Sequence, residues 1–150
     1  MTATITTIKN HLTDLVEGYT PTVRSGVKFR RSLGTEPLEK MIKGSRFDRS
    51  FEWVAAGPVP SKNWGGSAHE CDTKMELHVG YMGRQDDREL ADRIDADTET
   101  ITKYLFQSGQ SWPDALRNIV PDGDPRTVPA VAEGNNVLVR VIPYRVTYDI

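Results

Sequence analysis

Cysteine and long apolar runs are scarce in this sequence, and both absences narrow the class of protein. Cys71 is the single cysteine among 150 residues, so no disulfide can form within the chain and the common thiolate-based metal sites are excluded. No stretch of about 18 consecutive apolar residues occurs, and the first residues lack the basic start and apolar core of a signal peptide. We therefore expect a protein of a reducing compartment that neither spans a membrane nor is exported by a signal peptide.

The sequence also lacks a convergent set of catalytic or ligand-binding residues. Gly65-Gly66 is followed by neither the Gly-Lys-Ser/Thr ending nor the helix start of a phosphate-binding loop. His69, Glu70, Cys71 and Asp72 are adjacent in a predicted loop, but successive side chains point in different directions and cannot by themselves form a triad. We predict no catalytic, cofactor-binding or metal site. A small metal-dependent hydrolase that uses His69, Glu70 and Asp72 is the least favoured alternative.

Charge is distributed unevenly along the chain. The net charge of −2 and the pI near 5.9 argue against the broad basic surface that binding to phosphate backbones requires. Residues 24–49 nevertheless carry a net +5, and the remainder carries −7. This distribution fits either a solvated surface segment or two unlike patches that dock head to tail between copies of the chain. The basic residues of this segment are Arg24, Lys28, Arg30, Arg31, Lys40, Lys43, Arg46 and Arg49.

Hydrophobic periodicity predicts two long helices and a short one. Apolar residues recur at three- and four-residue spacing over residues 4–17, and Gly18 ends that helix. A second apolar stripe begins after two aspartates at 86–87 and continues to the Ser-Gly pair at 108–109. The segment 35–44 has a capping Thr, an early Pro and a terminal Gly, which indicate one or two helical turns.

Alternating apolar residues predict four strands, which cover residues 22–31, 46–54, 73–81 and 137–150. Pro143 lies within the last of them and cannot donate a hydrogen bond to a neighbouring strand. We therefore expect a bulge or an exposed sheet edge at this position, where the apolar alternation shifts by one residue.

The connection between the second and third predicted strands, residues 55–72, contains two Pro and three Gly and is longer than most loops. It predicts a protruding hairpin loop with Trp64 at its tip, where the indole is equally suited to a binding contact or to folding back onto the sheet. The order of elements predicts one α+β domain over residues 1–150. The expected architecture is a mostly antiparallel sheet with helices packed on one face and a long hairpin loop.

The pattern resembles the tail terminator family of long-tailed bacteriophages, also called tail-completion or minor tail proteins. The likeness rests on the N-terminal helix ITTIKNHLTDLVEG, the hairpin strands RSFEWV and KMELHVGY, the helix RELADRIDADTETITKYLFQSG and the closing strand NNVLVRVIPYRVTYDI. It implies a non-catalytic virion protein without cofactors, in the tail or neck of the particle and in the host cytoplasm before assembly. Such a protein forms a hexameric ring that caps the tail tube, stops its polymerisation and joins it to the head-side connector protein. DNA passes through the ring without sequence-specific binding.

A head-completion or neck adaptor protein is the alternative that the same pattern allows, since small α+β domains serve both roles and fold alone does not fix function. Residues 36–44 are the part of the chain that is hardest to match to the family pattern. The expected interface consists of opposite charges across subunits, an aromatic loop tip and the last strand. We assign to it Arg24, Arg30, Arg31 and Arg46 against Asp87, Asp92, Asp95 and Glu99, together with Trp64, Tyr144 and Tyr148.

Overall fold

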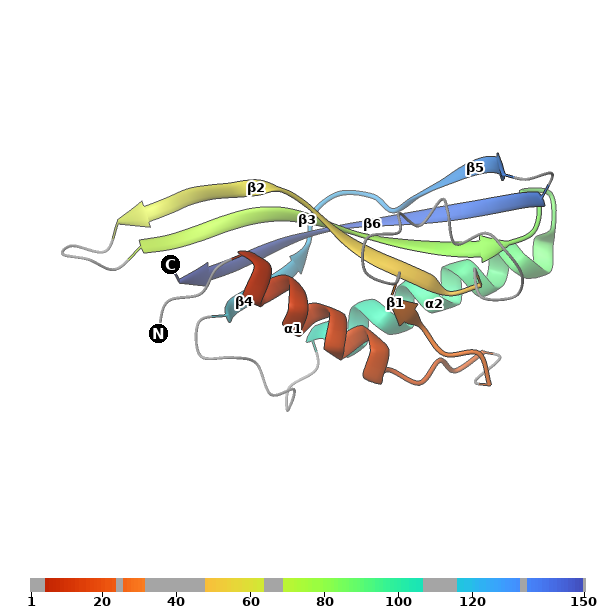
Figure 1. Cartoon of the computed structure of the whole chain (residues 1–150), viewed down its shortest axis with the longest axis horizontal. Coiled ribbons are helices and arrows are strands. Elements are labelled where there is room, and N and C mark those ends of the chain that lie inside the picture. The colour runs from red at the N-terminus through yellow and green to blue at the C-terminus, as the bar shows by residue number, and fades with distance from the viewer. Residues whose placement is uncertain are drawn as a thin grey trace.

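A computed structural model describes residues 5–23, 26–31, 48–63, 69–106, 116–132 and 135–149. These residues form an α+β fold with two helices and a mostly antiparallel sheet of six strands, which confirms the predicted fold class. Figure 1 shows the long strands running along the length of the molecule. The elements are α1 Ile5–Gly18, β1 Arg30–Arg31, β2 Ser50–Asn63, β3 His69–Met82, α2 Arg88–Phe106, β4 Leu116–Pro121, β5 Arg126–Ala132 and β6 Asn135–Asp149.

The sheet has the strand order β1-β2-β3-β6-β4, with β5 also paired to β6. Only the short pairing of β1 with β2 is parallel among the described strands. Alternate side chains of β3 are buried, from Cys71 to Tyr81, as a strand with one core-facing side requires. The main core cluster contains these β3 residues together with residues of both helices, which are Ile8, Leu12 and Val16 of α1 and Leu90, Ile94, Ile101 and Leu105 of α2.

Both long helices begin and end close to their predicted positions. Gly18 is the last residue of α1. The Asp87 carboxylate accepts a hydrogen bond from the Leu90 N–H at 3.2 Å, so Asp87 caps the N-terminus of α2 as its type and position predict. The short helix predicted over residues 35–44 lies outside the described residues.

Among the described residues of the range 22–31, the predicted strand is found only at β1, Arg30–Arg31, and the prediction is wrong for residues 22–23 and 26–29. The carbonyls of Val23 and Val27 accept hydrogen bonds from the Arg49 side chain instead of from a neighbouring strand. Local alternation could not reveal this, because the competing donor lies more than twenty residues further along the chain.

The predicted long hairpin loop over residues 55–72 is not found in the described residues. β2 continues to Asn63 and β3 begins at His69, so most of the predicted loop is strand. The register shifts between Ala55 and Pro58, and again between Pro60 and Lys62. These bulges accommodate prolines that an uninterrupted ladder would exclude. Trp64 itself lies outside the described residues.

Pro143 marks neither a bulge nor an outer edge strand. β6 pairs with β3 without a register shift, and Pro143 lies opposite Glu76. On the other side of β6, the residues from Asn135 to Val141 pair with β5, and those from Tyr144 to Tyr148 pair with β4. Pro143 therefore lies at the junction between these two strands. The carbonyl of Pro143 accepts from the Asp122 N–H at 3.0 Å on that side. Because the N–H and C=O of a strand residue point the same way, the missing N–H of Pro143 faces this junction and interrupts no pairing with β3.

The predicted shift of alternation at Pro143 has a different origin. Leu138, Ile142 and Tyr144 share one face of β6 and are buried in the main core. Val137 and Val141 lie on the opposite face and are buried as well. The apolar pattern therefore changes because both faces are buried along the first half of β6, while the pleat continues unchanged.

Candidate subunit interface

A buried ion pair joins the start of β2 to α2. Arg49 is fully buried and has a φ of 60°, a backbone conformation that residues other than glycine rarely adopt. Its Nε and Nη2 donate to the two carboxylate oxygens of Asp97, each at 2.9 Å. The Tyr81 hydroxyl donates to the same carboxylate at 2.8 Å. We call Arg49, Asp97 and Tyr81 the buried lock, since a buried charge is tolerated only when it is paired and hydrogen-bonded in this way.

The buried lock also holds the segment that precedes β1. Arg49 Nη1 donates to the Val27 carbonyl at 2.7 Å, and Nη2 donates to the Val23 carbonyl. The guanidinium carbon lies 5.6 Å from the centre of the Phe29 ring, within the range of a cation–π contact. Burial and the charge of Asp97 raise the pKa of Tyr81 well above its ordinary value, so its hydroxyl stays a donor at physiological pH.

A second ion pair stands beside the lock. Arg93 Nη2 donates to the Asp48 carboxylate at 3.1 and 3.3 Å, and the Met82 N–H donates to the same carboxylate at 3.3 Å. The guanidinium of Arg93 lies 5.8 Å from the centre of the Tyr81 ring. Asp48 therefore fixes the end of β3 against the first half of α2.

These two ion pairs build the walls of a groove with a volume of about 610 Å³. Its apolar lining consists of Val23, Met82, and Leu90 and Ala96 of α2. Arg49 binds the Val23 carbonyl, and Asp48 binds the Met82 N–H. Three exposed carboxylates stand around it. We call this feature the acidic groove, and its lining residues are Val23, Met82, Asp87, Glu89, Leu90, Asp92, Arg93 and Ala96.

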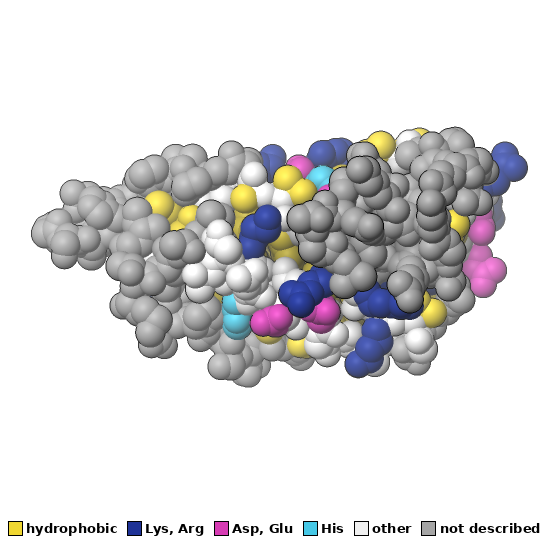
Figure 2. All heavy atoms as spheres, viewed as in Figure 1, with side chains coloured by type: hydrophobic (Ala, Val, Ile, Leu, Met, Phe, Trp, Pro, Cys, Tyr) yellow, Lys and Arg dark blue, Asp and Glu magenta, His cyan; other side chains and the backbone are white. Residues whose placement is uncertain are grey.

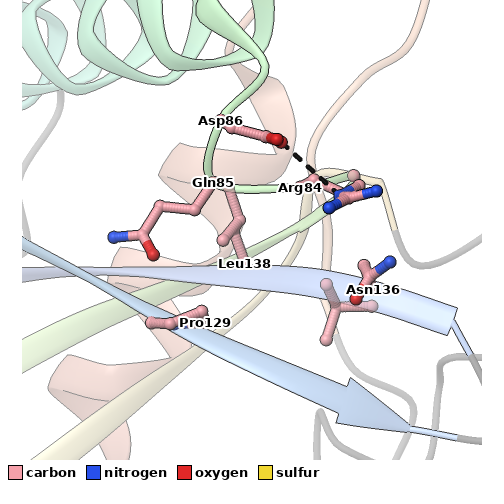
Figure 3. A pocket seen from close by; sticks show the side chains of 8 residues that line it. Arg84, Gln85, Asp86, Pro129, Asn136 and Leu138 are labelled. Atoms are coloured by element: carbon pink, nitrogen blue, oxygen red, sulfur yellow. Dashed lines mark ion pairs between the residues drawn. The ribbon is translucent and has the colours of Figure 1, made fainter.

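A second hollow of about 470 Å³ lies on the other side of the β3–α2 connection. Figure 3 shows the Gln85 side chain of the connection directed toward Pro129 of β5, while the Asp86 side chain points toward Arg84. The Arg84 and Asp86 side chains form an exposed ion pair with a separation of 3.5 Å. This hollow offers amide and guanidinium donors beside apolar surface, which suits a binding contact better than proton transfer or nucleophilic chemistry.

Among the predicted interface residues, those on β1 and the first half of α2 are best placed to meet a partner. Arg30, Arg31 and Asp92 are exposed, and Arg31 makes a long ion pair of 3.6 Å with Glu17. No interaction of the Asp92 carboxylate is found with the described part of the chain. Arg24, Arg46 and Trp64 lie outside the described residues.

Three further acidic residues already have partners within the subunit. Asp95 pairs with Arg140 of β6 at 3.1 Å, and Glu99 pairs with Lys103 at 3.0 Å. Asp87 caps α2, although its side chain remains largely accessible. The carboxylates available to a neighbour are thus concentrated at the start of α2.

Tyr144 and Tyr148 are buried in the core, which does not fit the interface role predicted for them. The Tyr144 hydroxyl lies 2.7 Å from the Thr102 hydroxyl, and burial raises the pKa of Tyr144 to about 12. The Tyr148 hydroxyl accepts a hydrogen bond from Thr73 at 3.3 Å. The prediction followed from treating the last strand as an exposed edge, whereas β6 is an inner strand with neighbours on both sides.

Sequence reasoning missed the buried lock, although one signal was present. Asp97 lies three residues after Ile94 and four before Ile101, and so falls within the apolar stripe of α2. A carboxylate on a buried helix face needs a cationic partner. Nothing in the sequence identifies Arg49 as that partner.

The residues of the alternative hydrolase, His69, Glu70 and Asp72, lie in the first four positions of β3 and not in a loop. The described residues contain no group of three or more His, Cys, Asp or Glu side chains placed to hold a metal ion. Burial raises the pKa of the neighbouring Cys71 thiol, which disfavours the reactive thiolate form. The described geometry therefore gives this alternative no support.

Neither helix, within the ranges that the structure describes, has the length and hydrophobicity needed to cross a membrane. In comparisons with known proteins, no family model matches the chain and no curated protein matches its sequence.

Proposed function

We propose that this chain is a structural virion protein that assembles head to tail into a ring, as a tail terminator does. The observation that carries the proposal is the separation of unlike exposed charges on one subunit. Lys28, Arg30 and Arg31 are exposed around β1, and Glu89 and Asp92 are exposed at the start of α2. Contacts between two different patches can close into a ring, and complementary charge guides their docking.

The surface view fits this division in part. Figure 2 shows acidic side chains at the end of the molecule where α2 begins, with basic side chains at the same end. Basic and acidic side chains lie close together over α1 in the same view. Neither candidate contact surface carries charge of one sign alone in this view.

A sheet edge provides further support. β1 pairs only with the first two residues of β2, Ser50 and Phe51. Within the described residues, no strand pairs with the outer side of β2 from Glu52 to Asn63. Such an edge is a template for pairing with another chain. In the assembly that we propose, both helices cover one face of the sheet and this edge meets a neighbouring subunit.

In the proposed role the ring is hexameric, caps the tail tube, ends its polymerisation and binds the head-side connector. The protein needs no cofactor and catalyses no reaction. DNA passes through the ring without sequence-specific contacts, and the mature location is the tail or neck of the virion.

Native mass spectrometry and light scattering over a range of protein and salt concentrations test the ring. We expect a hexamer at low salt that dissociates as salt rises, because exposed ion pairs are screened over about 8–10 Å near physiological ionic strength. A monomer at every concentration and salt level contradicts the proposal.

A second assay separates the tail role from a neck role. Purified tail tube protein is allowed to polymerise with and without the ring, and tube lengths are measured by electron microscopy. A tail terminator binds tube ends and stops their growth. Binding to the portal side alone, without an effect on tube length, indicates a neck adaptor instead.

A further inference from the structure

We infer that the acidic groove receives the Lys28–Arg31 segment of a second copy of this chain. The inference rests on the proposed self-assembly and names the contact that carries it. It confines the acidic side of the contact to the start of α2, and it excludes Asp95 and Glu99, which belonged to the interface expected from the sequence.

The groove suits a basic segment with aliphatic stems. Val23, Met82 and Leu90 give it an apolar lining, and the exposed carboxylates of Asp87, Glu89 and Asp92 stand around that lining. Lysine and arginine cover apolar surface with their methylene groups while keeping their charged ends near carboxylates. A purely apolar partner would leave these carboxylates desolvated without a cation, at a cost in binding energy.

The Lys28–Arg31 segment has the matching form. Phe29 is buried in its own subunit, where its ring lies 5.8 Å from that of Tyr19. Lys28, Arg30 and Arg31 remain exposed. The buried Phe29 side chain therefore holds the backbone of the segment in place, which lowers the conformational entropy lost when the segment binds.

Apart from Arg31, which pairs with Glu17 at 3.6 Å, the charges on the two surfaces are not neutralised within the described part of the subunit. No ion pair of Glu89 or Asp92, and none of Lys28 or Arg30, is found among the described residues. Glu89 and Asp92 are also three residues apart on one helix, a spacing at which like charges repel. By contrast, Asp95 is already paired with Arg140. An incoming cation therefore gains most at the first turns of α2.

The groove is preformed because the buried ion pairs hold its walls. Arg49 binds the Val23 carbonyl, and Asp48 binds both the Met82 N–H and Arg93 of α2.

Disulfide cross-linking between two different chains tests the contact. One chain carries Asp92→Cys and the other carries Arg30→Cys, and the two are mixed, oxidised and analysed by mass spectrometry. We expect the mixed disulfide to form several-fold faster than in a control mixture of Glu99→Cys with Arg30→Cys. Cys71 is buried and its pKa is raised by burial, so it does not interfere.

A charge exchange gives a second readout that does not depend on geometry alone. We expect Asp92→Arg to weaken self-association at least tenfold, and the double variant Asp92→Arg, Arg30→Asp to recover most of it. Both side chains are exposed, so neither change disturbs the core. If the unmodified protein forms oligomers, but the mixed disulfide does not form and the double variant does not recover self-association, the groove contact alone is overturned. Absence of any oligomer in the unmodified protein overturns both the contact and the proposed ring.

Discussion

Replacing Asp97 by Asn removes the carboxylate from the buried lock while nearly preserving the shape of the side chain. Asp97 accepts two hydrogen bonds from Arg49 and one from Tyr81, and its side chain is 2% exposed, against 1% for Arg49. The Asn variant takes from the buried Arg49 guanidinium the negative charge that Asp97 supplies. Arg49 cannot move to solvent without releasing the Val23 and Val27 carbonyls that it binds.

The expected loss of stability follows from this burial. Removing one partner of a buried ion pair costs about 3–5 kcal/mol, because the remaining charge is desolvated without compensation. A domain of this size is stable by about 5–15 kcal/mol, so the loss is a large share of the total. At about 2–4 °C per kcal/mol, the melting temperature falls by roughly 6–20 °C. Tyr81→Phe removes one hydrogen bond to the same carboxylate and is expected to cost less, about 1.5–3 kcal/mol.

Urea denaturation followed by circular dichroism measures these differences at one protein concentration, because assembly would otherwise change the apparent stability. Glu99→Gln is the matched control. Its partner Lys103 is exposed, and such i,i+4 pairs contribute only about 0.3–0.5 kcal/mol. An Asp97→Asn variant within about 1 kcal/mol of the unmodified protein, at an unchanged slope of stability against urea, would refute the assignment of a buried, tightly paired lock.

Two further changes test the turn before α2 and the core of β6. Gly83→Ala is expected to destabilise the fold by about 1–3 kcal/mol in thermal melts, since Gly83 has a φ of 140° and an added Cβ would lie 2.5 Å from Leu90 Cδ2; Gly26→Ala, with nothing within 4 Å of its added Cβ, is the control expected to change little. Burial raises the pKa of Tyr144 to about 12. The neutral hydroxyl therefore contributes stability that is fully present below pH 10 and is lost as pH rises through about 12. We expect Tyr144→Phe to remove roughly 2–3 kcal/mol of that alkaline loss, measured as a shallower fall of unfolding free energy between pH 10 and 12, and an unchanged fall would contradict the burial of this hydroxyl.

The sequence predicted the elements that are governed by local periodicity. The apolar stripe of α2 and its Asp87 cap were sufficient to place that helix, and alternation placed β6, residues 50–54 of β2 and residues 73–81 of β3. Gly and Pro were misleading between β2 and β3. Pro58 and Pro60 predicted a loop, but bulges on a strand with an open outer side accept prolines without ending the strand.

The candidate interface could be predicted only in outline. Charge counting identified Arg30, Arg31 and Asp92 as candidates, and all three are exposed. It could not separate Asp92 from Asp95, because the partner of Asp95 is Arg140, which is distant in the sequence and adjacent only in the folded sheet. Long-range pairing of this kind has no local signature.

The buried lock explains why the acidic groove and the β1 segment have fixed relative positions. Well-packed apolar side chains in place of a buried ion pair often stabilise a protein as much or more. They would not, however, bind the carbonyls of Val23 and Val27, which have no strand partner among the described residues and need a donor. Arg49 supplies these donors while bound to Asp97, so one residue ties the segment before β1 to α2. The buried lock therefore contributes to the position of both surfaces that are proposed to meet across subunits.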